Sequence, residues 1–493
     1  MNDPTLIEQI LFATRIVVGS VTALSILLTK REPVACLGWL LSIATFPLIG
    51  SLAYLVGGLN PYQTHTRRMR ERLRRSLGVG AGISHQEKMT AIGANLDALE
   101  RSKYHGFQNA QSWVAGVTAT DFHRDVGIEF LINSSATYDE FERAVLAAKE
   151  YIFVQFYQIL PDKVGRRFFF QLRRKAKEGV KVYVMYDAMG SYKLRRDLLD
   201  AVRSSGIQIV NFLAMHPLKR RFQINWRNHR KIIICDGEVA FVGGFNIGES
   251  YLEGDQQDTP LWRDAHFKLS GSCVDVIQKV FVGDWLFATG QTIAFKSTSV
   301  PHAKNASDNS ASNFVAVVPS GPSDQRALMH STLTAILHGA ETRVWLSTAY
   351  FVPDSQILGA MRQAVERGVD VRVVIPKRSN HPITDFCTTS YFSEFLDLGL
   401  KVYLYRPGMC HAKLLLADSD LVLSGSSNLD YRSFFLNFEL DLLVRDRRIA
   451  PLVEKFLTES FHQSEVLSQL HVRPGNLPLR TARNLIRLFA PIM

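Results

Sequence analysis

The chain of 493 residues is too long for one hydrophobic core and predicts two or three domains. Apolar residues make up 46% of it, which excludes a globally disordered chain. The formal net charge of +11 indicates an anionic partner, either nucleic acid or an acidic membrane surface. The five cysteines include no Cys-x-x-Cys pair, and this odd, unpatterned set argues against a disulfide framework and a structural zinc site.

The N-terminal region, residues 1–63, is apolar enough to enter a membrane. No Lys, Arg, Asp or Glu occurs between Glu32 and Arg67, and residues 34–59 can span a bilayer. The preceding apolar segment contains Arg15, whose long side chain can reach an interface. We therefore predict a hairpin of two transmembrane helices, about 7–29 and 34–59. A signal peptide or an interfacial helix is the alternative for the first, and the start MNDPTLIEQ, without basic residues, argues against a cleaved signal.

Residues 64–121 are expected to form a basic juxtamembrane segment and a polar connector. Six arginines occur between Arg67 and Arg75. Because positively charged segments stay on the cytoplasmic side, this run places the soluble body in the cytoplasm, whereas Lys30 and Arg31 between the two helices favour the opposite orientation. The run is typical both of a topological stop signal and of a segment that binds anionic lipid headgroups.

The remaining chain contains two similar halves, residues 122–295 and 314–475. A linker rich in Ser, Asn and Ala, 296–313, separates them, and a basic, apolar tail, 476–493, follows. The tail suits either the membrane surface or a position docked on the body. Each half alternates strand-like and helix-like segments, which predicts an α/β sandwich in each. The sequence CHAKLLLADSDLVLSGSSN, from Cys410, repeats NHRKIIICDGEVAFVGGFN, from Asn228.

Four polar positions repeat at one offset, 411 − 229 = 182 residues. They are His229 and His411, Lys231 and Lys413, Asp236 and Asp418, and Asn246 and Asn428. A single His-x-Lys would be typical of a solvated strand edge, but duplication of the whole pattern indicates two copies that converge on one site. Each aspartate belongs to the repeated catalytic motif but precedes a turn, so we expect it to fix local geometry.

This residue set suits a phosphodiester. Lysines and asparagine amides hold oxyanions, one neutral histidine attacks phosphorus, and the other donates and accepts a proton. Small residues, Gly243–Gly244 and Gly425–Ser426, allow close backbone approach to a ligand, and Gly244 and Ser426 are therefore counted with the substrate site. The set needs no metal and no other cofactor, since it contains no cluster with zinc-ligand spacing.

The doubled motif H-x-K-x(4)-D-x(6)-G-[GS]-x-N resembles the paired signature of the phospholipase D superfamily. The segments INWRNHRKIIICDG, GGFNIGESYL, WRDAH, YFVPD and GSSNLDYRSFFLNFE are similar to those of bacterial cardiolipin synthases, and the likeness covers nearly the whole chain. It implies two phospholipase D-like halves in a pseudo-twofold arrangement behind the membrane hairpin, in the bacterial inner membrane. The resemblance leaves the oligomeric state open.

The resemblance also implies a reaction. One phosphatidylglycerol would be attacked by His229, giving a phosphatidyl-histidine and glycerol, with His411 as acid and then base; the order can be reversed. Asp264 and Glu439, 35 and 28 residues after His229 and His411, are the expected carboxylates that orient the rings (264 − 229 = 35 and 439 − 411 = 28). Tyr350 is expected either to line the pocket or to pack.

Three other functions are open at this stage. A membrane-bound phospholipase D would use water as the acceptor, or a related phosphatidyltransferase would use another alcohol. A phosphodiesterase that cleaves DNA would use the same site and the basic charge. A lipid-binding scaffold is disfavoured because both motifs keep every polar member. Two membrane spans favour lipid substrates, anionic membrane lipids included, and no nucleic-acid partner is expected.

Overall fold

The computed structural model describes residues 4–29, 33–55, 122–124, 126–132, 134–213, 226–252, 261–296, 314–322, 327–472, 477–488 and 490. The predicted connector 64–121, with its arginine run, and the linker after residue 296 lie outside the described residues. The chain divides into two compact units. One contains residues 1–72 and 215–225, and the other contains residues 73–214 and 226–493.

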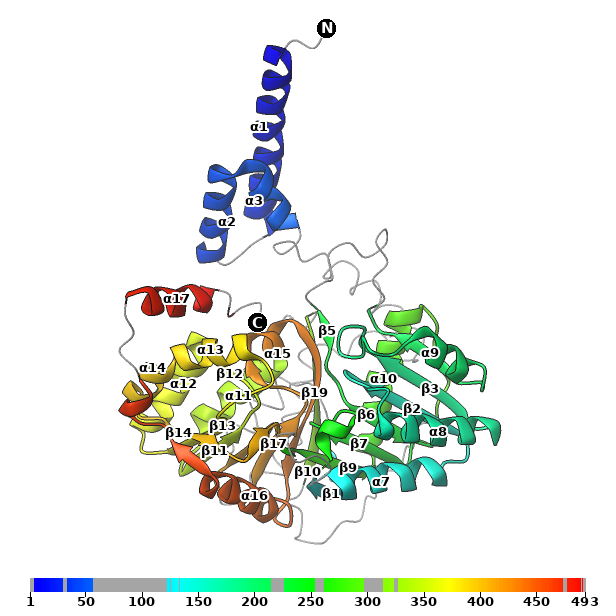
Figure 1. Ribbon diagram of the computed structural model, residues 1–493. Coiled ribbons are helices and arrows are strands. Elements are labelled where there is room, and N and C mark those ends of the chain that lie inside the picture. Colours follow the sequence, from blue (N-terminus) through cyan, green and yellow to red (C-terminus); the bar gives the residue numbers. More distant parts are fainter. Residues whose placement is uncertain are drawn as a thin grey trace, which may run out of the picture. The chain divides into compact units, whose positions relative to one another are not determined.

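In the described residues of the first unit there are three apolar helices, α1 (Pro4–Thr29), α2 (Pro33–Thr45) and α3 (Pro47–Ala53) (Figure 1). Within α1, the 21 residues Glu8–Leu28 are long and apolar enough to cross a membrane. Most of the large apolar side chains on α1 are exposed, as a helix facing lipid requires. Among its described residues, Ile26, Ile43 and Tyr54 form a buried hydrophobic cluster. The predicted first span is thus a helix of suitable length.

The predicted second span, 34–59, is wrong as a continuous helix over the described residues. Pro47 has no backbone N–H, and the residue before a proline is pushed out of the helical region. Phe46 accordingly has φ −134° and ψ 77°, and α2 ends at Thr45. A Cβ on Gly50 would lie 2.6 Å from the Ser42 carbonyl oxygen, so glycine lets α3 fold back against α2. The 13 residues of α2 reach only about 20 Å, short of a bilayer core.

The second unit contains two mixed sheets (Figure 1). The first has the order β1-β9-β7-β6-β2-β3-β4. Its strands are β1 (Val126–Ile132), β2 (Tyr151–Phe156), β3 (Lys181–Tyr186), β4 (Gln208–Asn211), β6 (Ile232–Cys235), β7 (Val239–Gly243) and β9 (Ala265–Gly271). Its helices are α7 (Ser134–Ala147), α8 (Lys163–Lys177), α9 (Arg196–Arg203) and α10 (Cys273–Thr289).

The second sheet has the order β10-β19-β17-β16-β11-β13-β14-β20. Its strands are β10 (Phe314–Ser320), β11 (Arg343–Ser347), β13 (Asp370–Pro376), β14 (Lys401–Tyr405), β16 (Leu414–Ala417), β17 (Leu421–Gly425), β19 (Asn437–Arg445) and β20 (Ser464–Val466). Its helices are α11 (Leu328–Gly339), α12 (Ser355–Glu366), α13 (Pro382–Ser390), α14 (Phe392–Asp397), α15 (Tyr431–Phe435) and α16 (Ala450–His462).

The two strand orders correspond, with β6 matching β16 and β9 matching β19. In both sheets three neighbouring strands are parallel, β2-β3-β4 in the first and β11-β13-β14 in the second. All four residues of β6 and of β16 are buried, because each strand is central and covered on both faces. Asp162 and Asp354 cap α8 and α12 in the same way. The α/β class predicted from the sequence is confirmed.

Two short strand pairs join the sheets. Strand β5 (Arg227–Asn228) pairs in parallel with β19, and β15 (Gly408–Cys410) pairs in parallel with β8 (Leu261–Arg263). Arg230, which is buried, adds a side-chain tie. It pairs with Asp284 and donates to the carbonyl oxygens of Glu439 and Ser320 at 2.9 and 3.1 Å. The first sheet is thereby fastened to β10 and β19 of the second.

The C-terminal tail is docked on the body. Helix α17 (Leu477–Leu488) lies against α13, and the Arg487 guanidinium donates to Ser390 Oγ at 3.0 Å and sits 3.9 Å from the centre of the Tyr391 ring. Ala490 is buried with Val352 and Cys387. Of the two positions expected for the tail, the structure therefore has the docked one.

Candidate active site

The repeated histidines and lysines lie directly before two equivalent central strands. Lys231 immediately precedes β6, and Lys413 immediately precedes β16. Side chains alternate along an extended chain, so His229 and Lys231 lie on one side and Arg230 on the other. Arg230 there contacts the Asp284 carboxylate and the Ser320 carbonyl oxygen of β10. All four repeated side chains are buried, with His229 the most exposed at 9%. The sequence repeat thus brings its histidines and lysines into one buried site.

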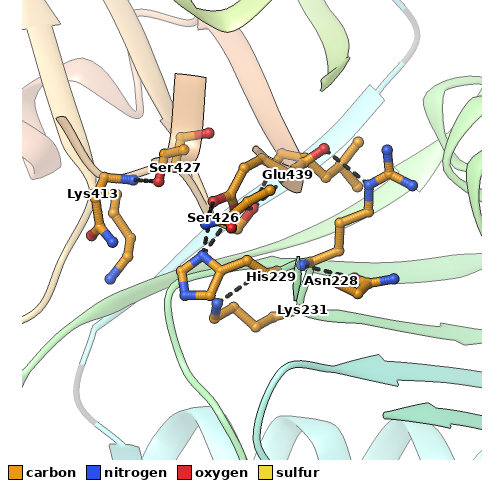
Figure 2. A network of polar contacts seen from close by, with 12 residues as sticks. Asn228, His229, Lys231, Lys413, Ser426, Ser427 and Glu439 are labelled. Atoms are coloured by element: carbon orange, nitrogen blue, oxygen red, sulfur yellow. Dashed lines mark hydrogen bonds and ion pairs between the residues drawn. The ribbon is translucent and has the colours of Figure 1, made fainter. Parts of the chain in front are cut away.

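Each histidine is held by a carboxylate from the other sheet. His229 Nδ1 lies 2.9 Å from Glu439 Oε2, and His411 Nδ1 lies 2.6 Å from Asp264 Oδ2. Figure 2 shows the His229 ring and the Glu439 carboxylate facing each other. The pairing expected from distance along the chain, Asp264 with His229 and Glu439 with His411, is therefore wrong.

Backbone hydrogen bonds explain why the pairs cross. The His229 N–H donates to the carbonyl oxygen of Phe438, the residue before Glu439, at 2.9 Å. The His411 N–H donates to the carbonyl oxygen of Arg263, the residue before Asp264, at 2.8 Å. Each histidine is thus held by one main-chain and one side-chain contact to a pair of adjacent residues from the other half of the body. The strand pairs β5–β19 and β8–β15 set this register.

The two carboxylates are supported differently. Glu439 accepts hydrogen bonds from Ser426 Oγ at 2.6 Å and from Asn437 Nδ2 at 3.2 Å. Asp264 accepts from the backbone N–H of Ala265 at 2.8 Å. A Cβ at Gly244 would lie 2.0 Å from Asp264 Oδ1, so this glycine makes room for the carboxylate. Gly244 and Ser426 hold the same place in the repeat and act on the carboxylates in different ways.

The lysine ammonium groups lie beside the histidines. Lys231 Nζ donates to the His229 carbonyl oxygen at 2.6 Å, and Lys413 Nζ donates to that of His411 at 2.5 Å. Lys413 Nζ also lies 2.9 and 3.1 Å from the two ring nitrogens of His411. Burial lowers the pKa of Lys231 to about 7 and that of Lys413 to about 8. An anion between the two ammonium groups would favour their charged forms and so offset the effect of burial on their pKa values.

The histidines are neutral near pH 7. Burial, aided by the lysine charges, lowers the pKa of His229 to about 4 and that of His411 to about 3. Although burial opposes it, the contact with His229 and the charge of nearby Lys231 hold the pKa of Glu439 below its usual value. The ionised Glu439 carboxylate beside the neutral His229 imidazole fixes the Nδ1–H tautomer of His229 and leaves the lone pair on its Nε2. This arrangement suits attack on an electrophile such as phosphorus.

The family model for cardiolipin synthase, PLD-like domain, matches residues 142–285 and 333–460, which together make up more than half of the chain. The chain belongs to this PLD-like cardiolipin synthase family. The first matched segment includes His229 and Asp264, and the second includes His411 and Glu439, so both contribute to each crossed histidine and carboxylate pair.

Relatives that match over nearly their whole length agree with the family, and one solved structure agrees with the fold. Cardiolipin synthase A of Pseudomonas putida (strain GB-1) is 33% identical over 475 residues, 96% of each chain. Cardiolipin synthase 1 of Bacillus cereus (strain ATCC 14579) is 32% identical and covers 95% of this chain and 91% of its own. The crystal structure of phosphatidylserine synthase from Haemophilus influenzae Rd KW20 covers 78% of this chain and all of its own with a TM-score of 0.58. At 16% identity this last likeness supports the fold alone.

The motif aspartates of this PLD-like protein contact backbone rather than the histidines. Asp236 accepts from the N–H groups of residues 149–151 at 2.7–2.9 Å. Asp418 accepts from the N–H groups of residues 341–343 at 2.7–3.2 Å. Both have positive φ, 54° and 50°, at the turn after β6 and after β16. Their contacts fix a turn at the end of the strand opposite the histidine.

The two motif asparagines have unequal contacts. Asn246 Nδ2 donates to Tyr251 Oη at 2.6 Å, and its Oδ1 accepts from the Gln158 N–H at 3.2 Å. The Asn428 N–H donates to Ser433 Oγ at 3.0 Å, and Asn428 Oδ1 is buried with no hydrogen-bond partner among the described residues. Asn246 is therefore a support for the loop and for Tyr251.

Three aromatic residues beside the histidines were given no role from the sequence. The Tyr157 ring centre lies 5.1 Å from that of His229, and those of Tyr251 and Trp262 lie 5.6 and 4.9 Å from that of His411. For Trp262, the sequence signal that could have suggested a role is its position two residues before Asp264. The Tyr350 hydroxyl donates to Asn380 Oδ1 at 2.6 Å, and a place for Tyr350 in the pocket stays a prediction.

Proposed function

We propose that this protein is a phosphatidyltransferase that makes cardiolipin from two molecules of phosphatidylglycerol and releases glycerol. The observation that carries the proposal is the 33% identity, over 96% of both chains, to a protein described as cardiolipin synthase A. The site supports the chemistry, because it combines two neutral histidines, each held by a carboxylate, with two buried lysines. Cations hold the non-bridging phosphate oxygens while an imidazole acts on phosphorus.

In the proposed first step, His229 Nε2 attacks the phosphorus of the donor lipid. A P–N bond forms, and the P–O bond to the glycerol headgroup breaks. His411 gives a proton to the departing glycerol oxygen, so that glycerol leaves as a neutral alcohol. The negative phosphate beside Lys413 opposes the charge that lowers the pKa of His411, and this raises the protonated fraction of His411 in the complex.

In the second step, the terminal hydroxyl of another phosphatidylglycerol attacks the phosphatidyl-histidine. His411 takes the hydroxyl proton, a new P–O bond forms, and the P–N bond breaks with its electron pair returning to His229. Glu439 orients His229 in both steps and Asp264 orients His411. Lys231 and Lys413 hold the phosphate, and no metal or other cofactor takes part. Asp236 and Asp418 keep the strand turns in shape.

We also propose that residues 122–295 and 314–475 are two halves related by a pseudo-twofold axis, preceded by a membrane segment, 1–63. The corresponding strand orders and the reciprocal histidine and carboxylate pairs support this relation. Helix α1 would anchor the protein in the membrane that holds its substrates, with the body on the cytoplasmic side as the arginine run suggests. The shorter α2 and α3 would lie at the interface beside it.

A direct assay tests this function. Detergent-purified full-length protein is incubated with phosphatidylglycerol as the only lipid, and cardiolipin and glycerol are measured together. We expect equal amounts of both products. Glycerol without cardiolipin would instead indicate a hydrolase, and DNA cleavage without either product would remove the lipid function.

Two variants serve as controls for that assay. We expect His229→Ala and His411→Ala each to lose at least about 10³-fold in rate, because removing one member of a cooperating catalytic unit is nearly as costly as removing all. Chelators should have no effect. Near-normal activity in either variant would refute a single shared site.

A further inference from the structure

A hollow of about 440 Å³ lies beside the candidate active site and has no part in the chemistry described above. It is lined by Trp262, residues 377–380 and residues 405–409, and is called the basic hollow below. The last two segments follow the carboxyl ends of the parallel strands β13 and β14. Ligands of open α/β sheets bind at this edge, because loops of neighbouring strands meet there.

The basic hollow carries three cationic side chains, Lys377, Arg378 and Arg406. Lys377 is paired with Glu465 at 2.6 Å. Arg378 and Arg406 are exposed, and neither forms an ion pair with another described residue. The nearby carboxylate of Asp385 accepts from the Ser379 N–H at 2.9 Å. Two guanidinium groups are thus available for an anion, and guanidinium geometry matches phosphate oxygens.

One wall of the basic hollow leads directly to His411. Met409 lines the hollow two residues before His411, and Trp262 lies with its ring centre 4.9 Å from that of His411. Two residues of extended chain span about 7 Å. The phosphorus and terminal hydroxyl oxygen of a glycerol headgroup are joined by five bonds of about 1.5 Å, which extend roughly 6 Å. A phosphate in the hollow would therefore place that hydroxyl near His411.

The matching loop of the first sheet begins with the opposite charge. It follows β3 and begins with Asp187, whose buried carboxylate accepts from the Asn228 N–H at 3.0 Å and from the Met189 N–H at 2.9 Å. The corresponding loop after β13 begins with Lys377 and Arg378. Directly after the strand, the loop beside His411 therefore presents two cations where its counterpart presents a carboxylate held by backbone N–H groups.

We propose that the basic hollow binds the phosphate of the acceptor phospholipid and presents its glycerol hydroxyl to His411, while the donor phosphate lies between the two histidines. This rests on the proposed function. In the transfer step the hydroxyl proton passes to His411, the hydroxyl oxygen bonds to phosphorus, and the P–N bond to His229 breaks. Arg378 and Arg406 hold the acceptor and thereby set the preference for an anionic lipid alcohol over an uncharged one.

The test separates the acceptor from the donor. Full-length wild type and Arg378→Gln/Arg406→Gln are assayed in detergent micelles for cardiolipin formation and for exchange of labelled glycerol into phosphatidylglycerol. Exchange needs phosphatidylglycerol only as the donor. We expect the KM for phosphatidylglycerol in cardiolipin formation to rise about tenfold or more, while exchange changes less than about twofold. Arg195→Gln/Arg362→Gln, which changes two exposed arginines elsewhere, should behave as wild type in both assays.

The possible outcomes distinguish the two proposals. An equal fall in both reactions, or no fall in either, would overturn the acceptor assignment. Absence of cardiolipin formation and of exchange in the wild type would instead count against the proposed function. Soluble glycerol phosphate, which has the same phosphate and alcohol without acyl chains, tests the source of the ligand. Its use as an acceptor as readily as phosphatidylglycerol would overturn the lipid assignment.

Discussion

The two histidine half-sites use the same residue types in unequal surroundings. Glu439, on His229, is a long carboxylate with hydroxyl and amide donors from Ser426 and Asn437. Asp264, on His411, is shorter and relies on the Ala265 N–H and on the space that Gly244 leaves. One half-site is fixed by extra hydrogen bonds and the other by close packing. The difference teaches that a duplicated motif does not give two interchangeable half-sites.

Among the changes that test this difference between the half-sites, neutralising the carboxylates should reduce activity most. In Glu439→Gln and Asp264→Asn the ring partner loses its charge, so the histidine tautomer and orientation are no longer fixed. We expect each variant to lose about 10²-fold or more in kcat, measured as cardiolipin formation with saturating phosphatidylglycerol. The crossed pairs also predict which ring responds: Glu439→Gln should perturb the NMR signals of the His229 ring more than those of the His411 ring. A larger change at the His411 ring than at the His229 ring would contradict the crossed pairs.

Substituting alanine for Gly244 and for Ser426 should separate the two kinds of carboxylate support, close packing and hydrogen bonding. Gly244→Ala puts a Cβ about where the Asp264 carboxylate lies, so we expect a loss of roughly 10-fold to 100-fold in activity and a lower Tm. Ser426→Ala removes one hydrogen bond to Glu439 without a clash, and about a tenfold loss is expected. Steady-state rates and thermal unfolding of both variants check this. A Gly244→Ala protein with wild-type activity would show that close packing does not hold Asp264.

The last prediction concerns pH and the two lysines. Their pKa values of about 7 and about 8 lie below the ordinary value, and a bound phosphate raises them. Phosphatidylglycerol therefore binds the protonated lysines best, and its KM should rise as pH increases through 7 to 8, by at most about tenfold per unit for each lysine. The KM measured from pH 6 to 9 checks the direction. A KM that falls with rising pH would rule out lysine cations as the phosphate ligands.

The repeat was enough to predict which residues meet. His229, Lys231, His411 and Lys413 lie together because an offset of 182 residues places them before equivalent strands of two sheets. Asp264 and Glu439 were identified as ring partners, but their pairing was not, because it depends on how the sheets face each other. The strand pairs β5–β19 and β8–β15 that decide this are only two and three residues long.

Other features lay beyond the sequence patterns for local reasons. Hydropathy predicted a second membrane span because it does not register the backbone break that Pro47 imposes after Phe46. Arg230 lies within the motif, but the sequence assigned it no role. Its role as a tie between the sheets becomes visible only when the folded structure shows the carbonyl groups to which it donates. Tyr157 and Tyr251 were given no role, because only the folded loops bring these aromatic rings beside the histidines.

The central claim is that the half-sites have different roles, with His229 as the nucleophile. Quenching the wild type at alkaline pH during turnover with labelled phosphatidylglycerol, followed by peptide mass spectrometry, tests it directly, since a phosphatidyl-histidine carries the label. The account predicts label on His229 and none on His411. Label on His411 would reverse the roles, and rapid turnover with no labelled histidine at any time would contradict the covalent mechanism.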